Sequence, residues 1–256
     1  MKFTIDGNIL KKALESVQVK GKGSTSSGFG NTNLGTYALL VIKNQTLSVW
    51  NGNNTFFVKI DLPLEGEVIE GTYCVDSSTL IPYLKSFNED VLFQIGDFIS
   101  LRSGTRKASL PVIVTHPNDN ALGRIKNMLN HVRYEVQPTT MFTFGKSSYE
   151  GAFTLTQPQL KDAIKNCELV KSGVYKFDYN EHILTVSSRE SVTNKYEERI
   201  TPVFPTGEPA TIEFSSPIYA FFESDQMLNV YMKDEFPLLV VATDRMLLKA
   251  PTVSGE

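Results

Sequence analysis

The stretch FTIDGNILKKALESV, residues 3–17, occurs a second time as FTLTQPQLKDAIKNC at residues 153–167. Aligned without a gap, the two copies share five of fifteen residues, whereas average amino-acid usage gives roughly one match. In the first copy, apolar residues recur at i, i+3, i+4 and i+7, the spacing of an amphipathic helix that follows a short strand. These residues are Leu10, Ala13, Leu14 and Val17. A repeat this far apart predicts two copies of one domain.

Each half shows the same predicted order: a strand, a helix, several strands, a second helix and three final strands. In the first half we expect strands at 2–5, 36–42, 46–50, 55–62, 72–75, 91–95, 98–102 and 107–110, and a helix at 8–17. The second helix follows the capping residues Asp76, Ser77 and Ser78, with an apolar face on Leu80, Tyr83, Leu84 and Phe87. In the second half we expect strands at 152–155, 174–179, 183–187, 196–200, 210–214, 228–233, 237–242 and 246–250, with helices at 158–167 and 217–222. The predicted class is α+β.

The repeat divides the chain into three parts. Residues 1–115 are expected to form an N-terminal domain and residues 150–256 a C-terminal domain. Residues 116–149 fit no simple element and are interpreted as a connector with an insertion, which includes a short helical pattern at 122–130. The stretch 21–35 is rich in Gly, Ser and Asn and predicts a loop.

Composition excludes several classes of protein. The net charge of −3 over 256 residues argues against a uniformly basic surface, so any positive region must be local. Two cysteines, Cys74 and Cys167, fit a reducing compartment better than a disulfide scaffold. The first residues lack the apolar core of a signal peptide and no apolar run is long enough to span a bilayer, so we expect a soluble intracellular protein.

The chemistry-bearing residues do not form a recognisable catalytic or metal-binding pattern. His116, His131 and His182 lack the spacing of metal ligands. A phosphate-binding loop and a G-x-S-x-G nucleophile motif are also missing from the sequence. We therefore expect no enzymatic activity, no cofactor and no metal.

Both ends of the chain resemble the DNA sliding clamps. The segment DEFPLLVVATDRMLLKAPTVSGE, residues 234–256, is similar to the end of proliferating cell nuclear antigen. The segments KFTIDGNILKKALESV and TLSVWNGNNTFFVKIDLP, at residues 2–17 and 46–63, look more like the bacterial beta clamp. The order of these motifs along nearly the whole chain carries the resemblance.

The resemblance implies a ring with antiparallel sheets outside and two helices per domain inside. Two domains per chain imply a homotrimer with six domains. Such a ring encircles duplex DNA without reading its sequence, slides along it and serves as a processivity factor. DNA polymerase and a clamp loader would be partners through clamp-binding peptide motifs.

The resemblance also assigns candidate site residues. Those expected to face DNA are Lys11, Lys12, Lys85, Lys161 and Lys165. With Glu15 and Asp162 counted, the first and third helices each carry +1, so the helices sum to +2 in a negative chain. The expected partner-peptide pocket comprises Pro237, Leu238, Ala250 and Pro251. Ring closure requires two edge strands, with candidates at 98–102, 105–110 and 174–179.

The sequence leaves three other functions open. One is a processivity or checkpoint factor of the same fold that does not close into a ring. Another is a β-rich structural protein without a DNA function, and a third is an enzyme of unknown chemistry. The location would be the cytoplasm and nucleoid or the nucleus, and the mixed resemblance leaves a phage or viral origin open.

Overall fold

A computed structural model describes residues 1–18, 37–53, 56–87, 89–112, 132–135, 141–144, 147–149, 153–215 and 226–252. The chain divides into two compact units. The first consists of Met1–Asn53 and Val58–Ile125, and the second of Asn54–Phe57 and Lys126–Glu256. The predicted three-part division at 115 and 149 stays a prediction. The predicted loop at 21–35 and the predicted helices at 122–130 and 217–222 lie outside the described residues.

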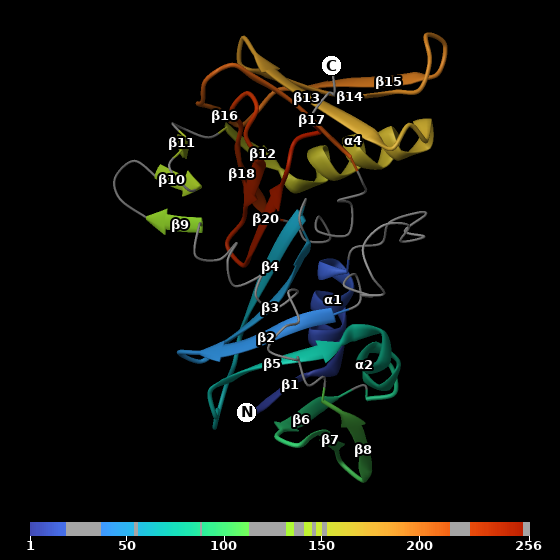
Figure 1. Cartoon of the computed structure of the whole chain (residues 1–256), viewed down its shortest axis with the longest axis vertical. Helices are drawn as coiled ribbons and strands as arrows, with labels where there is room; N and C mark the ends of the chain where they lie inside the picture. Colours follow the sequence, from blue (N-terminus) through green and yellow to red (C-terminus); the bar gives the residue numbers. More distant parts are fainter. Residues whose placement is uncertain are drawn as a thin grey trace. The chain divides into compact units, whose positions relative to one another are not determined.

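The described residues of the first unit form two helices and two sheets (Figure 1). One sheet has the order β1-β6-β7-β8, from Lys2–Asp6, Asp90–Ile95, Phe98–Ser103 and Arg106–Pro111. The other has the order β4-β3-β2-β5, from Phe56–Pro63, Thr46–Asn53, Tyr37–Lys43 and Gly71–Asp76. Helix α1 (Gly7–Val17) packs against helix α2 (Ser77–Leu84) and strand β3.

The second unit repeats this order. The strands of one sheet follow the order β16-β12-β18-β19-β20 and comprise Phe204–Pro205, Phe153–Thr156, Met227–Tyr231, Leu238–Val241 and Arg245–Lys249. The second sheet follows the order β15-β14-β13-β17, from Lys195–Ile200, Ile183–Arg189, Val174–Asn180 and Ala210–Ser215. Helix α4 (Gln157–Val170) runs along β14 and β15, as Figure 1 shows.

The segment interpreted as a connector contains regular structure that the sequence did not predict. Strands β9 (Val132–Glu135), β10 (Met141–Phe144) and β11 (Ser147–Tyr149) form an antiparallel three-stranded sheet. This sheet belongs to the second unit.

The two copies of the repeat bury the same positions. Phe3 and Phe153 are both buried, and each stacks on another ring, Phe3 on Phe93 at 4.8 Å and Phe153 on Tyr179 at 4.2 Å. The helical stripe is buried in both copies: Leu10, Ala13, Leu14 and Val17 in α1, and Leu160, Ala163, Ile164 and Cys167 in α4. The predicted duplication is therefore visible in the packing as well as in the sequence.

The predicted face of the second helix is wrong at one position. Tyr83 is 41% exposed, and Ile81 is buried in its place. Because the Asp76 side chain caps the helix and Ser77 is its first residue, the buried stripe runs i, i+3, i+4 and i+7 from Ser77, which passes through Leu80, Ile81 and Leu84.

Candidate functional site

Helices α1 and α4 are held in equivalent places by different caps. In α1, Asp6 Oδ1 accepts hydrogen bonds from the amides of Asn8 at 2.7 Å and Ile9 at 3.2 Å. In α4, Gln159 Oε1 accepts from the Thr156 amide at 3.3 Å and from the Thr156 hydroxyl at 2.7 Å. Both arrangements satisfy polar groups at the helix start, which fixes where each helix leaves its preceding strand.

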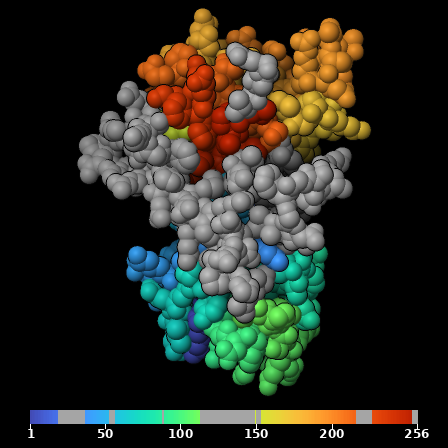
Figure 2. Space-filling model, viewed as in Figure 1, coloured from blue at the N-terminus to red at the C-terminus, as the bar shows by residue number. Residues whose placement is uncertain are grey.

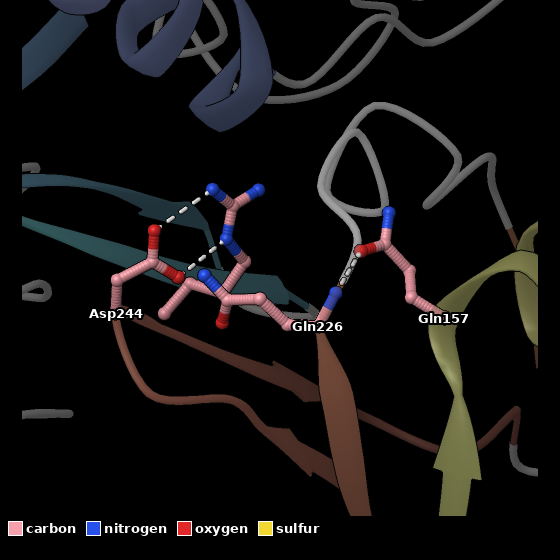
Figure 3. Close-up of polar contacts among 4 residues, drawn as sticks. Gln157, Gln226 and Asp244 are labelled. Atoms are coloured by element: carbon pink, nitrogen blue, oxygen red, sulfur yellow. Dashed lines mark hydrogen bonds and ion pairs between the residues drawn. The ribbon is translucent and has the colours of Figure 1, made fainter.

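The first residue of each helix is also tied to a neighbouring segment. The Gly7 amide donates to the Glu89 carbonyl at 3.3 Å, and the Gln157 amide donates to the Gln226 carbonyl at 3.0 Å. Gln157 and Gln226 share a second hydrogen bond, in which Gln157 Oε1 accepts from the Gln226 amide at 3.2 Å (Figure 3). At Gly7 a side chain is sterically excluded, since an added Cβ would lie 2.6 Å from the Phe87 carbonyl oxygen. These ties fix both helix starts against their own sheets.

The candidate DNA-facing lysines lie away from the buried stripes. Lys12 and Lys165 are exposed, and Lys11 and Lys161 are half-buried at equivalent positions of the two copies. Lys85 is exposed and forms the C-terminal cap of α2 rather than part of its body. The structure thus leaves all five side chains at least partly accessible to a ligand, each within its own unit.

The expected net charge of the third helix is wrong for the helix as folded. The sequence predicted an end at Cys167, but α4 continues to Val170 and ends where Lys171 adopts a left-handed conformation with φ of 61°. The additional turn includes Glu168, whose carboxylate accepts a hydrogen bond from the Tyr175 hydroxyl at 3.3 Å. Lys161 and Lys165 are therefore balanced by Asp162 and Glu168, so α4 is neutral and the described helices sum to +1 rather than +2.

The predicted pocket residues belong to two different environments. Pro237, Ala250 and Pro251 are half-buried, whereas Leu238 is completely buried. Leu238 pairs with Lys249 across β19 and β20, and side chains alternate between the two faces of a strand. The two residues therefore share a face with Val240, Val230 and Phe153, the last of which stacks on Tyr179 of β13. This is the core face of the sheet.

The opposite face of the same strands carries Tyr231, Leu239 and Leu248, which lie side by side in the register. We call it the outer face. All three residues are at most 2% exposed. Part of the β18–β20 region reaches the surface in the view of Figure 2, where it is red. Sequence reasoning missed these residues, because an unbroken apolar run such as LLVV does not reveal which residues lie on which face of the sheet.

Tyr149 of β11 packs against this region. Its ring meets those of Tyr231 and Phe236 edge-on, each at 6.4 Å, and its hydroxyl donates to the Pro237 carbonyl at 2.6 Å. The side chain is 1% exposed, and burial raises the pKa of the Tyr149 hydroxyl. The Lys233 ammonium lies 4.9 Å from the Phe236 ring centre. We refer to Tyr149, Tyr231 and Phe236 as the aromatic cluster.

The C-terminal segment and the β19–β20 turn are fixed by polar contacts. The Thr252 amide donates to the Glu213 carbonyl at 2.6 Å, which brings the residues after β20 alongside β17. In the turn between β19 and β20, the Arg245 guanidinium binds the Asp244 carboxylate through two hydrogen bonds, of 2.9 and 3.1 Å (Figure 3). Pro251 is therefore held in place by backbone contacts on the residue that follows it.

The described part of the chain contains no group of three or more His, Cys, Asp or Glu side chains arranged to hold a metal ion. No helix in that part has the length and apolar character needed to cross a membrane. Cys167 is buried, and burial raises the pKa of its thiol to about 12, with nearby Glu198 and Glu168 contributing. This environment keeps the thiol protonated and unreactive at neutral pH.

The solved structures that superpose on this chain include bacterial and archaeal proteins of one kind. A DNA polymerase III beta subunit from Eubacterium rectale superposes with a TM-score of 0.74 at 16% identity, over 99% of this chain and 66% of the other. PCNA from A. fulgidus, bound to the C-terminal region of FEN-1, superposes with a TM-score of 0.70 at 15% identity, over 100% of this chain and 99% of the archaeal one. PCNA from Thermococcus kodakaraensis superposes with a TM-score of 0.66 at 13% identity, over 98% of this chain and 99% of the other.

The chain has the fold of the DNA sliding clamps. It spans 66% of the bacterial subunit from Eubacterium rectale but 99% of the two archaeal proteins, so its length matches theirs. No protein-family model and no curated protein matches the sequence. The similarity at 13–16% identity therefore concerns the fold.

Several strands lie at sheet edges within the described residues, among them β8 in the first unit and β15 in the second. Strand β8 ends the first sheet of the first unit, and β15 ends the β13–β15 sheet of the second. The other edge of the latter, β17, is occupied by Thr252 and by Asp234, whose carboxylate accepts from the Thr211 amide at 2.7 Å. The expectation of an edge at 174–179 is wrong, because β13 pairs on both sides, and β7 (98–103) is likewise an inner strand.

Proposed function

We propose that this protein is a DNA sliding clamp: a homotrimeric ring that encircles duplex DNA, slides along it and tethers DNA polymerase and other replication proteins. The observation that carries the proposal is the clamp fold over the whole chain, with a length that matches 99% of archaeal PCNA. The proposed role is non-enzymatic and intracellular.

The proposed contact with DNA is electrostatic and weak. The candidate lysines are Lys11, Lys12, Lys85, Lys161 and Lys165. Contacts of this kind with phosphates give dissociation constants of only about 10⁻⁴–10⁻⁶ M. Because the described helices sum to only +1, lasting attachment must come from ring closure, and the lysines would guide the duplex without reading its bases.

The lysines can be tested together by charge reversal at the two equivalent positions. We expect Lys11→Glu with Lys161→Glu to reduce clamp loading and DNA-dependent stimulation of a polymerase, with a loss that grows as salt is lowered. The matched control is Lys43→Glu, because Lys43 is an exposed lysine on a strand rather than a helix. Equal stimulation by the double variant and the control across a salt series would remove these lysines from the DNA path.

We propose that the ring closes by pairing of β8 of one subunit with β15 of the next. Both strands are sheet edges within the described residues, which is the arrangement that a head-to-tail contact extends. Exposed side chains on β8 include Lys107 and Ser109, and those on β15 include Glu197. A closed trimer would have about three times the subunit mass of 28.6 kDa.

Light scattering after size exclusion separates this proposal from the second candidate, a factor of the same fold that does not form a ring. We expect a trimer mass for the natural chain and a subunit mass for Lys107→Glu with Ser109→Glu, because enclosing two added carboxylates in the paired edge would carry a desolvation cost. The Lys43→Glu control, on inner strand β2, should remain trimeric. A natural chain that runs at 28.6 kDa at all concentrations would favour the non-ring factor.

The proposed partner site is the neighbourhood of Pro237, Ala250 and Pro251, with Leu238 supporting it from the core face. Two of the similar structures carry peptides: A. fulgidus PCNA holds the C-terminal region of FEN-1, and a Helicobacter pylori beta clamp holds a DNA ligase peptide. We expect this chain to bind such a peptide and Pro237→Ser with Pro251→Ser to weaken the binding. The control is Pro205→Ser, an exposed proline in the same sheet. Unchanged affinity in the double variant would place the site elsewhere.

A further inference from the structure

The aromatic cluster occupies part of the surface next to the proposed partner site. Tyr149 belongs to β11, which comes 88 residues before Pro237 in sequence, yet its hydroxyl is bonded to the Pro237 carbonyl. Its ring lies against Tyr231, which is on the outer face with Leu239 and Leu248. Within the second unit, this side chain therefore joins the β9–β11 sheet to the strands around Pro237.

We propose that Tyr149 is a latch that holds β11 over the outer face of β18 and β19, and that a partner peptide binds after this latch opens. The inference rests on the proposed function, since it concerns regulation of the same partner site. The chain's own tyrosine would occupy a position beside Pro237 that an aromatic or aliphatic anchor of the peptide must take over. Binding is then coupled to release of the Tyr149–Pro237 hydrogen bond.

The latch contact is made by the last residue of a short strand. The contacts of Tyr149 include one hydrogen bond and two edge-on ring contacts, while Phe236 and Pro237 remain half-buried at the border of the cluster. Strand β11 has only three residues, all paired to β10, so it can separate from β18 without breaking a sheet ladder to that strand. Opening would expose the Tyr149 ring and break its hydrogen bond to the Pro237 carbonyl.

Two variants separate the hydroxyl from the ring. Tyr149→Phe removes only the hydrogen bond, and a net loss of about 1 kcal/mol corresponds to a roughly fivefold larger open population. Tyr149→Ala removes the ring as well and should open the latch further. The matched control is Tyr179→Phe, because Tyr179 is equally buried in the same unit but its hydroxyl has no hydrogen-bond partner.

The first measurement needs no ligand. Hydrogen–deuterium exchange of the full chain should be about fivefold faster at the amides of 147–149 in Tyr149→Phe than in the natural chain, and unchanged there in Tyr179→Phe. Equal exchange in all three proteins would overturn the latch, whatever the partner site does.

The second measurement uses the FEN-1 C-terminal peptide, labelled for fluorescence anisotropy. Because apparent affinity scales with the open fraction, Tyr149→Phe should lower the dissociation constant about fivefold, and Tyr179→Phe should not change it. Weaker binding by Tyr149→Phe would overturn the latch and make Tyr149 a wall of the pocket. If no protein binds the peptide while exchange still responds to Tyr149→Phe, the proposed partner site fails and the latch as a structural contact survives.

Discussion

Lys249 has a buried side chain, although lysine side chains usually lie in solvent. Its side chain is 1% exposed and lies on the core face of β20, opposite Leu238 and two residues from Leu247. Burial lowers the pKa of the Lys249 amine from its ordinary 10.5 to about 8. Burial in the folded protein therefore disfavours the protonated amine of Lys249, whereas in the unfolded chain water solvates the protonated amine.

The magnitude follows from the two pKa values. One pH unit corresponds to about 1.4 kcal/mol, so the interval from about 8 to 10.5 corresponds to about 3 kcal/mol. Below pH 8 Lys249 is protonated in both the folded and the unfolded state, so its burial lowers the free energy of unfolding by the full amount. Between pH 8 and 10.5 the unfolded chain binds more protons than the folded one, so the contribution of Lys249 to stability rises with pH and the cost disappears.

We expect Lys249→Met, which keeps the length of the side chain, to raise the free energy of unfolding by up to about 3 kcal/mol at pH 7. The measurement is urea unfolding followed by circular dichroism at several pH values from 7 to 10.5. The difference between variant and natural chain should shrink as pH rises, while Lys165→Met, at an exposed site, should stay within about 0.5 kcal/mol of the natural chain. A variant less stable than the natural chain at pH 7, or a difference independent of pH, would refute the reasoning.

Two further predictions concern the helix starts. Gly7→Ala should destabilise the first unit by about 1–3 kcal/mol, because its Cβ would lie 2.6 Å from the Phe87 carbonyl oxygen, and a thermal melt that matches the natural chain would count against it. Asp76→Ala should cost about 1 kcal/mol, since Asp76 accepts from the Ser78 amide at 2.9 Å and from the hydroxyls of Ser78 and Thr79. Thr79→Ala loses only the last contact and should cost less in the same urea titration.

The repeat predicted the helices well because the spacing of apolar residues is a local property. Leu10 and Leu160 are buried at equivalent positions, and both helices begin within one residue of their predicted starts. The end of α4 was missed by three residues, because Glu168 and Leu169 break the apolar pattern although the backbone continues to Val170. That extra turn changed the net charge of α4 from the predicted +1 to zero.

Features set by distant contacts were beyond sequence reasoning. Lys249 ends an apolar strand and reads as an ordinary terminal charge, and only the pairing of β19 with β20 places it on the core face. The edge position of β15 depends on sheet order, which alternating residues do not reveal. Tyr149 lies in a stretch with no clear pattern, and its contact with Pro237 joins residues 88 positions apart. The pocket residues Pro237 and Pro251 came from resemblance, and their role stays a prediction.

The most direct test of the proposed function is retention on DNA of defined topology. The protein is loaded onto nicked circular DNA with its clamp loader and ATP, separated from free protein by gel filtration, and measured again after a restriction enzyme linearises the circle. A ring that slides predicts stable retention on the circle at moderate salt and loss within minutes of linearisation. Equal loss from circular and linear DNA, or retention on both, would contradict a topological clamp.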